Sequence, residues 1–271
     1  MKTMGKHWRL LAVSLSIAAF LLPFSCAIAQ TDFGMWYELG AEKKLSKKWS
    51  ASAEAEFRTR NNSRTADRWS AGLCAEYKIA KWQLGSSKLS LKASGGYTLL
   101  YDNNPEKLSY KKSGDPKKWT PSYWGVRHRL NVSLGGSLDW KRLSVSLRER
   151  WQYTYRPEAE GKKYAFIYNV DDEISGYNLE PVKGKGKNVL RSRLEVGYDI
   201  ARCKFDPFVN VEMFNDNSGI QKMRYQAGID YRLKKQHIFT LTYRYQHVKD
   251  KDDADPETDC HLIGLGYKYK F

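Results

Sequence analysis

The sequence predicts an all-β fold: a transmembrane antiparallel up-and-down β-barrel of about 10–12 strands that follows a cleaved signal peptide. Three observations predict it: an alternating C-terminal strand that ends on an aromatic residue, an N-terminal export signal, and many stretches in which hydrophobic and polar residues alternate. Alternation with a period of two marks strands whose two faces meet different surroundings, as lipid and a polar lumen do.

The last twelve residues, 260–271, alternate clearly. The phase expected to face lipid is His261, Ile263, Leu265, Tyr267, Tyr269 and Phe271. The opposite phase holds mainly small and charged residues: Cys260, Leu262, Gly264, Gly266, Lys268 and Lys270. An ending of this kind is typical of outer-membrane barrels of Gram-negative bacteria. We therefore expect the cell outer membrane as the location, and the barrel-assembly machinery as a partner of the strand that ends at Phe271.

An export signal precedes the predicted barrel. Three basic residues come before an apolar run at 10–24, and Ala-Ile-Ala at 27–29 forms an A-x-A cleavage site. The run is too short to cross a membrane as a helix, and no later apolar run reaches the necessary length of about 20 residues. We expect residues 1–29 to be removed, which leaves 30–271 as a single barrel domain. Cys26 permits a lipoprotein alternative, but the residues before it form a poor lipobox.

Charge and cysteine content limit the possible partners. The formal net charge is +16, and losing Lys2, Lys6 and Arg9 with the leader reduces it to +13. Nucleic acid is the usual partner of so basic a chain, but export argues against it. The mature cysteines, an odd number without metal-ligand spacing, are Cys74, Cys203 and Cys260. They allow at most one disulfide, and we expect no zinc site and no cofactor.

Ten further stretches show the alternation before the last strand. They are residues 33–41, 49–60, 68–79, 88–101, 124–134, 143–155, 190–200, 205–214, 222–233 and 239–247. Short turns at 139–142, 201–204 and 234–237 are expected on the periplasmic side, and long loops at 102–121, 156–188 and 248–258 on the extracellular side. Part of the longest loop, 164–169, could extend a hairpin above the membrane. A soluble β-sandwich is the alternative, but its polar face would rarely carry this much arginine.

The strand count presents a problem of parity. Eleven alternating stretches make an odd count, which is unusual for bacterial barrels, and they place the start of the first stretch outside the cell. We expect ten complete strands, with 33–41 pairing irregularly or entering the lumen; twelve strands are the alternative. We predict that 49–60 closes the barrel against the last strand, with 33–41 as the competing candidate. Glu149 falls on the lipid phase, which predicts either a position near the headgroups or a bulge.

Arginine dominates the phases that we expect to face the lumen. The candidates for contact with anions are Arg58, Arg60, Arg68, Arg127, Arg129, Arg148, Arg150, Arg191, Arg193, Arg224 and Arg244. The acids that can neutralise some of them are Glu54, Glu56, Glu195 and Glu212. One interpretation is structural, because side chains nearly fill the lumen of a barrel with about ten strands. The other is a small channel or binding site for anions, since bases outnumber acids and arginine binds carboxylate and phosphate bidentately.

Two other functional classes leave weaker signals. Outer-membrane lipases and proteases use histidine at the extracellular rim, and this chain has His128, His247 and His261 on the lipid phase. No serine lies two residues after His247 or His261, and no G-x-S-x-G motif occurs, so we expect no enzyme. A surface-binding barrel is the third class: outer-membrane lipids surround the barrel, and the basic loop 102–121 could bind the anionic headgroups of lipopolysaccharide.

Several strand-like motifs resemble the family catalogued as domain of unknown function 2490. They are Met-Trp-Tyr-Glu-Leu at 35–39, Leu-Ser-Lys-Lys-Trp at 45–49, Glu-Ala-Glu-Phe-Arg at 54–58, Leu-Arg-Ser-Arg-Leu-Glu at 190–195, Pro207 with Glu-Met-Phe at 212–214, Arg-Tyr at 224–225, and Tyr-Arg-Tyr-Gln at 243–246. The resemblance covers nearly all of the mature chain. It implies an outer-membrane barrel, and it implies no particular activity, substrate or site residue.

Overall fold

The computed structural model describes residues 31–234, 236–249 and 258–271, and every regular element in this part of the chain is a strand. It contains no helix of the length and apolarity needed to cross a membrane. The predicted signal peptide at 1–29, the lipoprotein alternative at Cys26 and most of the predicted loop 248–258 lie outside the described residues.

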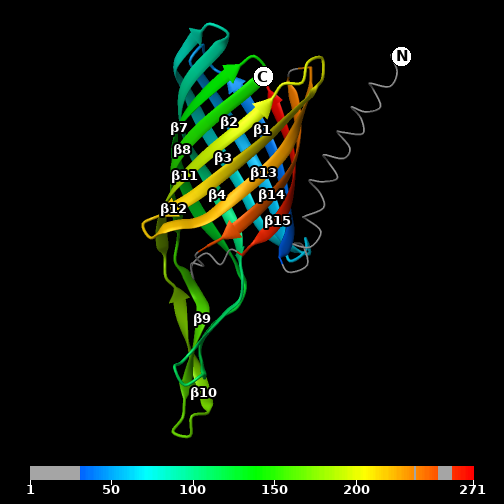
Figure 1. The fold of residues 1–271 in the computed structure, drawn as a ribbon. Helices are drawn as coiled ribbons and strands as arrows, with labels where there is room; N and C mark the ends of the chain where they lie inside the picture. The colour runs from blue at the N-terminus through cyan, green and yellow to red at the C-terminus, as the bar shows by residue number, and fades with distance from the viewer. Residues whose placement is uncertain (1–30, 235, 250–257) are drawn as a thin grey trace, which may run out of the picture.

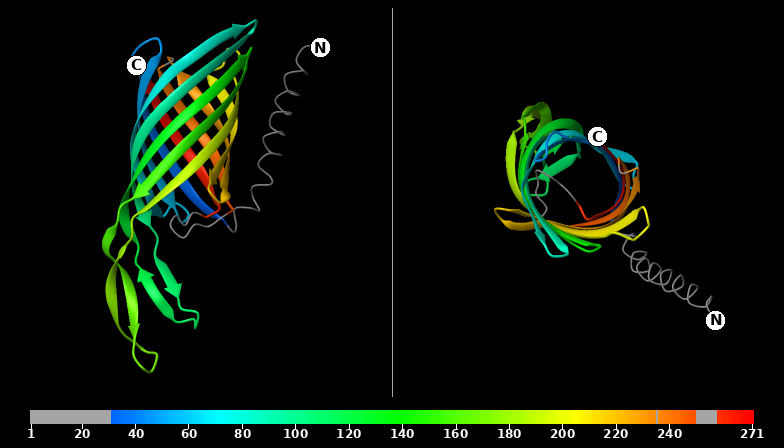
Figure 2. Two further views of the ribbon diagram at one scale, coloured as in Figure 1. Left: turned by 90° about the vertical axis from the view of Figure 1, so that its left-hand side faces the viewer. Right: turned by 90° about the horizontal axis from the view of Figure 1, so that it is seen from above.

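Eleven of the described strands form a closed barrel (Figures 1 and 2), which confirms the predicted fold class. Around the barrel the order is β1-β15-β14-β13-β12-β11-β8-β7-β4-β3-β2. The bounds are β1 Asp32–Lys44, β2 Trp49–Arg60, β3 Thr65–Leu84, β4 Ser87–Asn104, β7 Tyr123–Trp140, β8 Leu143–Arg156, β11 Lys185–Tyr198, β12 Phe205–Asp216, β13 Gly219–Leu233, β14 His237–Val248 and β15 Cys260–Lys270.

The barrel closes between β1 and β15, and this pair is parallel. Its register runs from Asp32 opposite Cys260 to Glu42 opposite Lys270, while β1 is antiparallel to β2. The predicted closure by 49–60 is therefore wrong, and so is the expectation that 33–41 pairs irregularly. The physical reason is parity: a ring with an odd number of strands, each connected antiparallel to the next, must contain one parallel pair.

Glycine on the inner face lets β1 and β15 lie close to their other neighbours, β2 and β14. A Cβ atom at Gly34 of β1 would overlap the carbonyl oxygen of Thr59 in β2, and one at Gly264 of β15 would overlap the side-chain hydroxyl of Thr242 in β14. Because only glycine lacks this atom, a larger residue at position 34 would push the backbones of β1 and β2 apart, and one at position 264 would displace the Thr242 side chain. These small inner residues thus make room beside the closing pair.

The two ends of the barrel differ in their connections. The short-turn end holds the β1–β2, β3–β4, β7–β8, β11–β12 and β13–β14 turns together with Phe271. The long-connection end holds the other five connections, of which β4–β7, β8–β11 and β14–β15 are long. Gly85 and Lys141 take positive φ angles of 58° and 53° in two of the short turns, as tight hairpins require. Because β1 runs parallel to β15, it starts at the long-connection end.

The outward phase forms an apolar surface around the barrel. Leu73 and Val132 are 69% and 58% exposed, which suits a side chain that faces lipid. Glu149 also faces outward, and the register of β8 with both neighbouring strands is unbroken there, so the alternative of a bulge is wrong. The carboxylate of Glu149 instead accepts a 2.6 Å hydrogen bond from the hydroxyl of Ser192 on β11.

A second sheet of four strands projects from the long-connection end (Figures 1 and 2). Its order is β10-β9-β6-β5, with bounds β5 Lys107–Tyr110, β6 Pro116–Thr120, β9 Ala159–Tyr168 and β10 Ile174–Val182. The stretch 102–121 is therefore not a loop throughout: its first residues continue β4, and it contains the β5–β6 hairpin. The hairpin predicted around 164–169 is present as β9–β10. The strands β5 and β6 are short, carry several lysines and show little apolar alternation, which explains why the sequence pattern missed them.

Candidate lumenal anion site

A cavity of about 1030 Å³ lies inside the barrel. It touches Lys185 and Gln221 near the long-connection end, and Lys141 and Lys268 near the short-turn end. Among the residues that the structure describes, nineteen lysines and arginines line this cavity against nine aspartates and glutamates. The described lining therefore carries a large excess of positive charge.

Ten of the eleven predicted arginines and all four predicted acids line the cavity. The exception is Arg60, which forms an ion pair with Asp67 at 3.2 Å near the end of β2. The two residues meet at a register shift, because Arg58 pairs with Arg68 and Thr59 with Ala66, which leaves Asp67 as an extra residue of β3. Alternation alone does not reveal such a shift.

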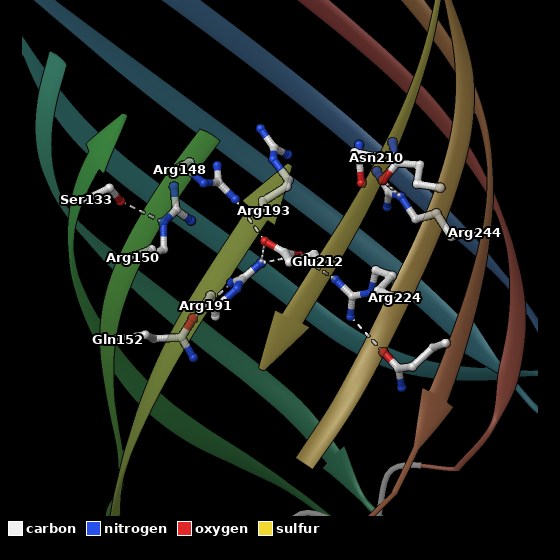
Figure 3. A network of polar contacts seen from close by, with 12 residues as sticks. Ser133, Arg148, Arg150, Gln152, Arg191, Arg193, Asn210, Glu212, Arg224 and Arg244 are labelled. Carbon is white, nitrogen blue, oxygen red and sulfur yellow. Dashed lines mark hydrogen bonds and ion pairs between the residues drawn. The ribbon is translucent and has the colours of Figure 1, made fainter. Parts of the chain in front are cut away.

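Glu212 on β12 joins three of the arginines (Figure 3). Its carboxylate accepts hydrogen bonds of 2.9 Å from Arg148 on β8 and from Arg191 on β11, and Arg224 on β13 lies 3.7 Å away. Glu212 is only 4% exposed. One carboxylate thus neutralises guanidinium groups from three strands, and the group keeps a net positive charge.

Asp102 on β4 is a second acidic centre, which the sequence analysis missed. It accepts a 3.0 Å hydrogen bond from Nη2 of Arg68 on β3, and Nε of Arg127 on β7 lies 3.0 Å from the same carboxylate oxygen. All three side chains are buried. The Asp-Asn-Asn sequence at 102–104 resembles a turn, so the end of β4 was not predicted to continue into the lumen.

Trp36 on β1 contacts two arginines through its ring. The sequence pattern predicted that Trp36 faces inward but indicated no role for it. The guanidinium carbons of Arg58 and Arg244 lie 3.3 and 3.9 Å from its ring centre, within the range of cation–π contacts. Arg244 also forms a 3.0 Å ion pair with Glu38. These buried side chains from β1, β2 and β14 narrow the cavity from one side.

Four arginines on β8 and β11 lie side by side, and the neighbouring acids are too few to neutralise their positive charge. Arg148 lies opposite Arg193 and Arg150 opposite Arg191 in the register of the two strands, an arrangement of like charges that ordinarily destabilises a sheet. Arg150 donates a 2.9 Å hydrogen bond to Ser133 on β7 and has no ion pair with a described residue (Figure 3). Arg129 bonds the Thr154 hydroxyl at 3.4 Å and no other side chain that the structure describes, so Arg129 and Arg150 offer donors to an anion.

The predicted histidines bond groups other than a catalytic serine. Nδ1 of His128 lies 2.7 Å from the Tyr97 hydroxyl, and that of His261 lies 2.6 Å from the Tyr243 hydroxyl. His247 hydrogen-bonds Asp259 at 2.9 Å. Burial raises the pKa of Asp259, but the Val248 backbone N–H and His247 lower it by more, so its carboxyl remains more acidic than usual.

Within the described residues, neither a disulfide nor a cluster of metal ligands contributes to this site. The three cysteines that the structure describes, Cys74, Cys203 and Cys260, form no disulfide. Within the same part of the chain, no group of three or more histidine, cysteine or acidic side chains is placed to hold a metal ion. The chemistry of the interior is therefore that of guanidinium, ammonium, carboxylate and amide groups.

The family model described as "Protein of unknown function (DUF2490)" matches residues 33–257. The chain belongs to this family. The closed barrel and its apolar outer surface make the DUF2490 protein an outer-membrane β-barrel protein, as the resemblance of its motifs implied. No curated protein matches the chain.

Among solved structures, the DUF2490 barrel is similar to other outer-membrane barrels. The NanC porin is 13% identical, with a TM-score of 0.47, 89% of this chain covered and 100% of that one. The translocator domain of the autotransporter NalP from Neisseria meningitidis is also 13% identical, with a TM-score of 0.44, 92% of this chain covered and 95% of that one. At such low identity these similarities concern the fold alone.

Proposed function

We propose that the DUF2490 barrel is a narrow channel or binding site for small anions, with its short-turn end toward the periplasm. The observation that carries this proposal is a cavity that touches both ends of the barrel and has about twice as many basic as acidic side chains in its described lining. A positively charged wall with a low dielectric constant attracts anions and repels cations. Glu212 and Asp102 hold part of this charge in place, while Arg129 and Arg150 stay available to a solute.

Conductance with ion selectivity tests the proposal. In planar bilayers under a KCl gradient, the wild type is expected to show anion selectivity. The double variant Arg129→Ser and Arg150→Ser should lower the chloride-to-potassium permeability ratio by roughly threefold or more, because it removes the two unbalanced charges. Arg202→Asn, in the β11–β12 turn, removes one charge outside the lumen and should leave the ratio unchanged. A wild-type barrel that never conducts would exclude the channel and leave only a binding site.

We further propose that the barrel is not an enzyme. His247 and Asp259 form a pair at the long-connection end, but no serine stands in a nucleophile motif beside them in the sequence. Detergent-solubilised protein is therefore expected to hydrolyse no phospholipid. Hydrolysis that disappears with His247→Asn would reverse this assignment.

A further inference from the structure

The barrel interior is charged asymmetrically across its width. The wall formed by β7, β8 and β11 contributes these bases to the cavity: Arg127, Arg129, Arg148, Arg150, Arg156, Lys185, Lys187, Arg191 and Arg193. In the closed order of the barrel, β1 is five strands from β11 in one direction and five from β8 in the other. The β1–β2 wall, which therefore faces the basic one, contributes Glu38, Glu54, Glu56 and a single base, Arg58.

Of the acids on the β1–β2 wall, Glu54 is the unpaired one. Glu38 is bound to Arg244 at 3.0 Å, and Glu56 to Arg58 at 2.6 Å. Glu54 is exposed to the cavity and forms no ion pair with any residue that the structure describes. Its neighbour in register is Gly40, and the side chain of Lys268 lies over that glycine without reaching ion-pair distance of Glu54.

Glu54, Arg129 and Arg150 line the same cavity. Glu54 lies opposite Gly72 on β3, Gly72 opposite Thr98 on β4, and Thr98 opposite Arg129 on β7, so that Glu54 and Arg129 stand in one row across four neighbouring strands with only small residues between them. Arg150 likewise has no carboxylate partner among the described residues, and it does not bridge to Glu54. Two opposite charges thus face one water-accessible cavity and remain apart. Such a pair fits a solute that carries both signs of charge.

We propose that this lumen binds small zwitterions, with the anionic group at Arg150 and Arg129 and an ammonium group at Glu54. The inference rests on the proposed anion site and adds a second recognition point to it. A guanidinium offers paired donors to a carboxylate, whereas a compact ammonium needs only a carboxylate within reach. An anion without the ammonium would leave Glu54 unsatisfied, so the charge separation of the solute decides the affinity.

Calorimetry with matched ligands tests the zwitterion site, and it requires no conductance. In glycine, 4-aminobutyrate and 6-aminohexanoate the distance between the ammonium and the carboxylate increases. Acetate, butyrate and hexanoate are their counterparts without the ammonium group. In wild-type barrel folded in detergent, at least one amino acid should bind about threefold more tightly than its counterpart, as expected for one solvated ion pair. Glu54→Gln should abolish this ratio, whereas Arg150→Gln should weaken both members of each pair.

Glu76→Gln provides the matched control, because Glu76 on β3 also faces inward but is paired with Lys92 at 2.9 Å. It should preserve the preference for the amino acid. If carboxylates bind but no amino acid surpasses its counterpart, or if Glu54→Gln leaves the ratio unchanged, the zwitterion site is wrong and the anion site stands. If neither series binds to correctly folded barrel, the anion site itself is wrong.

Discussion

Glu212 is the side chain on which most of the lumenal charge arrangement depends. It is almost fully buried, and it holds Arg148 and Arg191 directly while Arg224 lies nearby. Without its negative charge, three guanidinium groups would face one another in a region with little water. Removing one partner of a buried ion pair ordinarily costs more than the pair contributes, because the remaining charges stay desolvated.

Glu212→Gln is therefore expected to destabilise the barrel by about 3 kcal/mol. The shift of heat-modifiable migration on a gel to a lower temperature measures this loss. Glu54→Gln is the matched control, since Glu54 is exposed and has no ion pair with a described residue, and it should not move the transition. Equal stability of the two variants would contradict the role given to Glu212.

Trp36 leads to a second expectation at the residue scale. Its ring and the guanidinium groups of Arg58 and Arg244 fill one side of the cavity. If the lumen conducts, Trp36→Ala should raise the single-channel conductance, roughly twofold, because side chains set the free cross-section of so small a barrel. Trp140→Ala, at an outward position that is 50% exposed, should leave it unchanged. A fall in conductance with Trp36→Ala would show that the tryptophan does not obstruct the lumen.

Sequence patterns predicted which side chains face inward, but not how they pair. Alternation placed Arg148, Arg191 and Glu212 on the inner phase, and the structure brings them together. It could not show that they meet, because contacts across a lumen depend on strand tilt and stagger. It also missed Asp102, which continues a strand through a turn-like sequence, and it did not show that Arg60 pairs with Asp67, the extra residue of β3 at a register shift.

At the level of elements, β1 decides how the ring closes. Its alternation was as readable as that of any other strand, but its partner was not, since alternation contains no information about direction. The start of β1 is fixed by Asp32, whose carboxylate accepts backbone hydrogen bonds of 3.0 Å from both Asn61 and Asn62 in the β2–β3 turn. Successive backbone N–H groups in a left-handed turn form a natural cradle for such a carboxylate.

Gly34→Ala is expected to loosen β1 where the ring closes, because the added Cβ would overlap the carbonyl oxygen of Thr59 in β2 and crowd the Leu262 side chain in β15. Crowding of this kind typically costs about 1–3 kcal/mol. Proteolysis of the folded barrel at elevated temperature measures the effect. Gly136→Ala on β7 is the control, since a Cβ there would meet no atom within 4 Å. If both variants resist the protease equally, β1 has more freedom at Gly34 than the close packing implies.

On the scale of the whole molecule, an electrostatic contact helps to join the two hairpins of the projecting sheet. Lys118 of β6 donates a 2.7 Å hydrogen bond to Glu180 of β10, and Lys163 of β9 lies 3.1 Å from the same carboxylate. These hydrogen bonds lower the pKa of Glu180 below its usual value of 4.5. The stabilisation is therefore complete above that usual value, and it is lost as the pH falls through the lower pKa of the folded state.

The β5–β6 and β9–β10 hairpins are accordingly expected to separate in acid, once the pH falls below 4.5 and through the lower pKa of Glu180. Spin labels at the exposed positions Leu108 and Leu179 report this as a broader distance distribution. Glu180→Gln should broaden the distribution already at pH 7 and remove its dependence on pH. A wild-type distribution that is unchanged in acid would mean that the backbone pairing of Lys118 and Trp119 with β9 is sufficient by itself.

The fold class could be predicted from the sequence because hydrophobic and polar residues alternate along each barrel strand. Only the β9–β10 hairpin of the projecting sheet could be predicted in this way, since β5 and β6 are only 4 and 5 residues long. The strand count lies between these cases: eleven stretches alternate, but the even count that is usual for bacterial barrels predicts ten. The error arose from a rule about other barrels, and not from the residues of β1.

The parallel pair also bears on how this chain can be re-engineered. In an even-numbered barrel both termini emerge at one rim, so they can be joined by a short linker and the chain reopened elsewhere. Here Asp32 lies opposite Cys260, while the chain finishes past Lys270 at the other rim. A circular permutant would need a linker that crosses the height of the barrel, so simple end-to-end joining should fail for this scaffold.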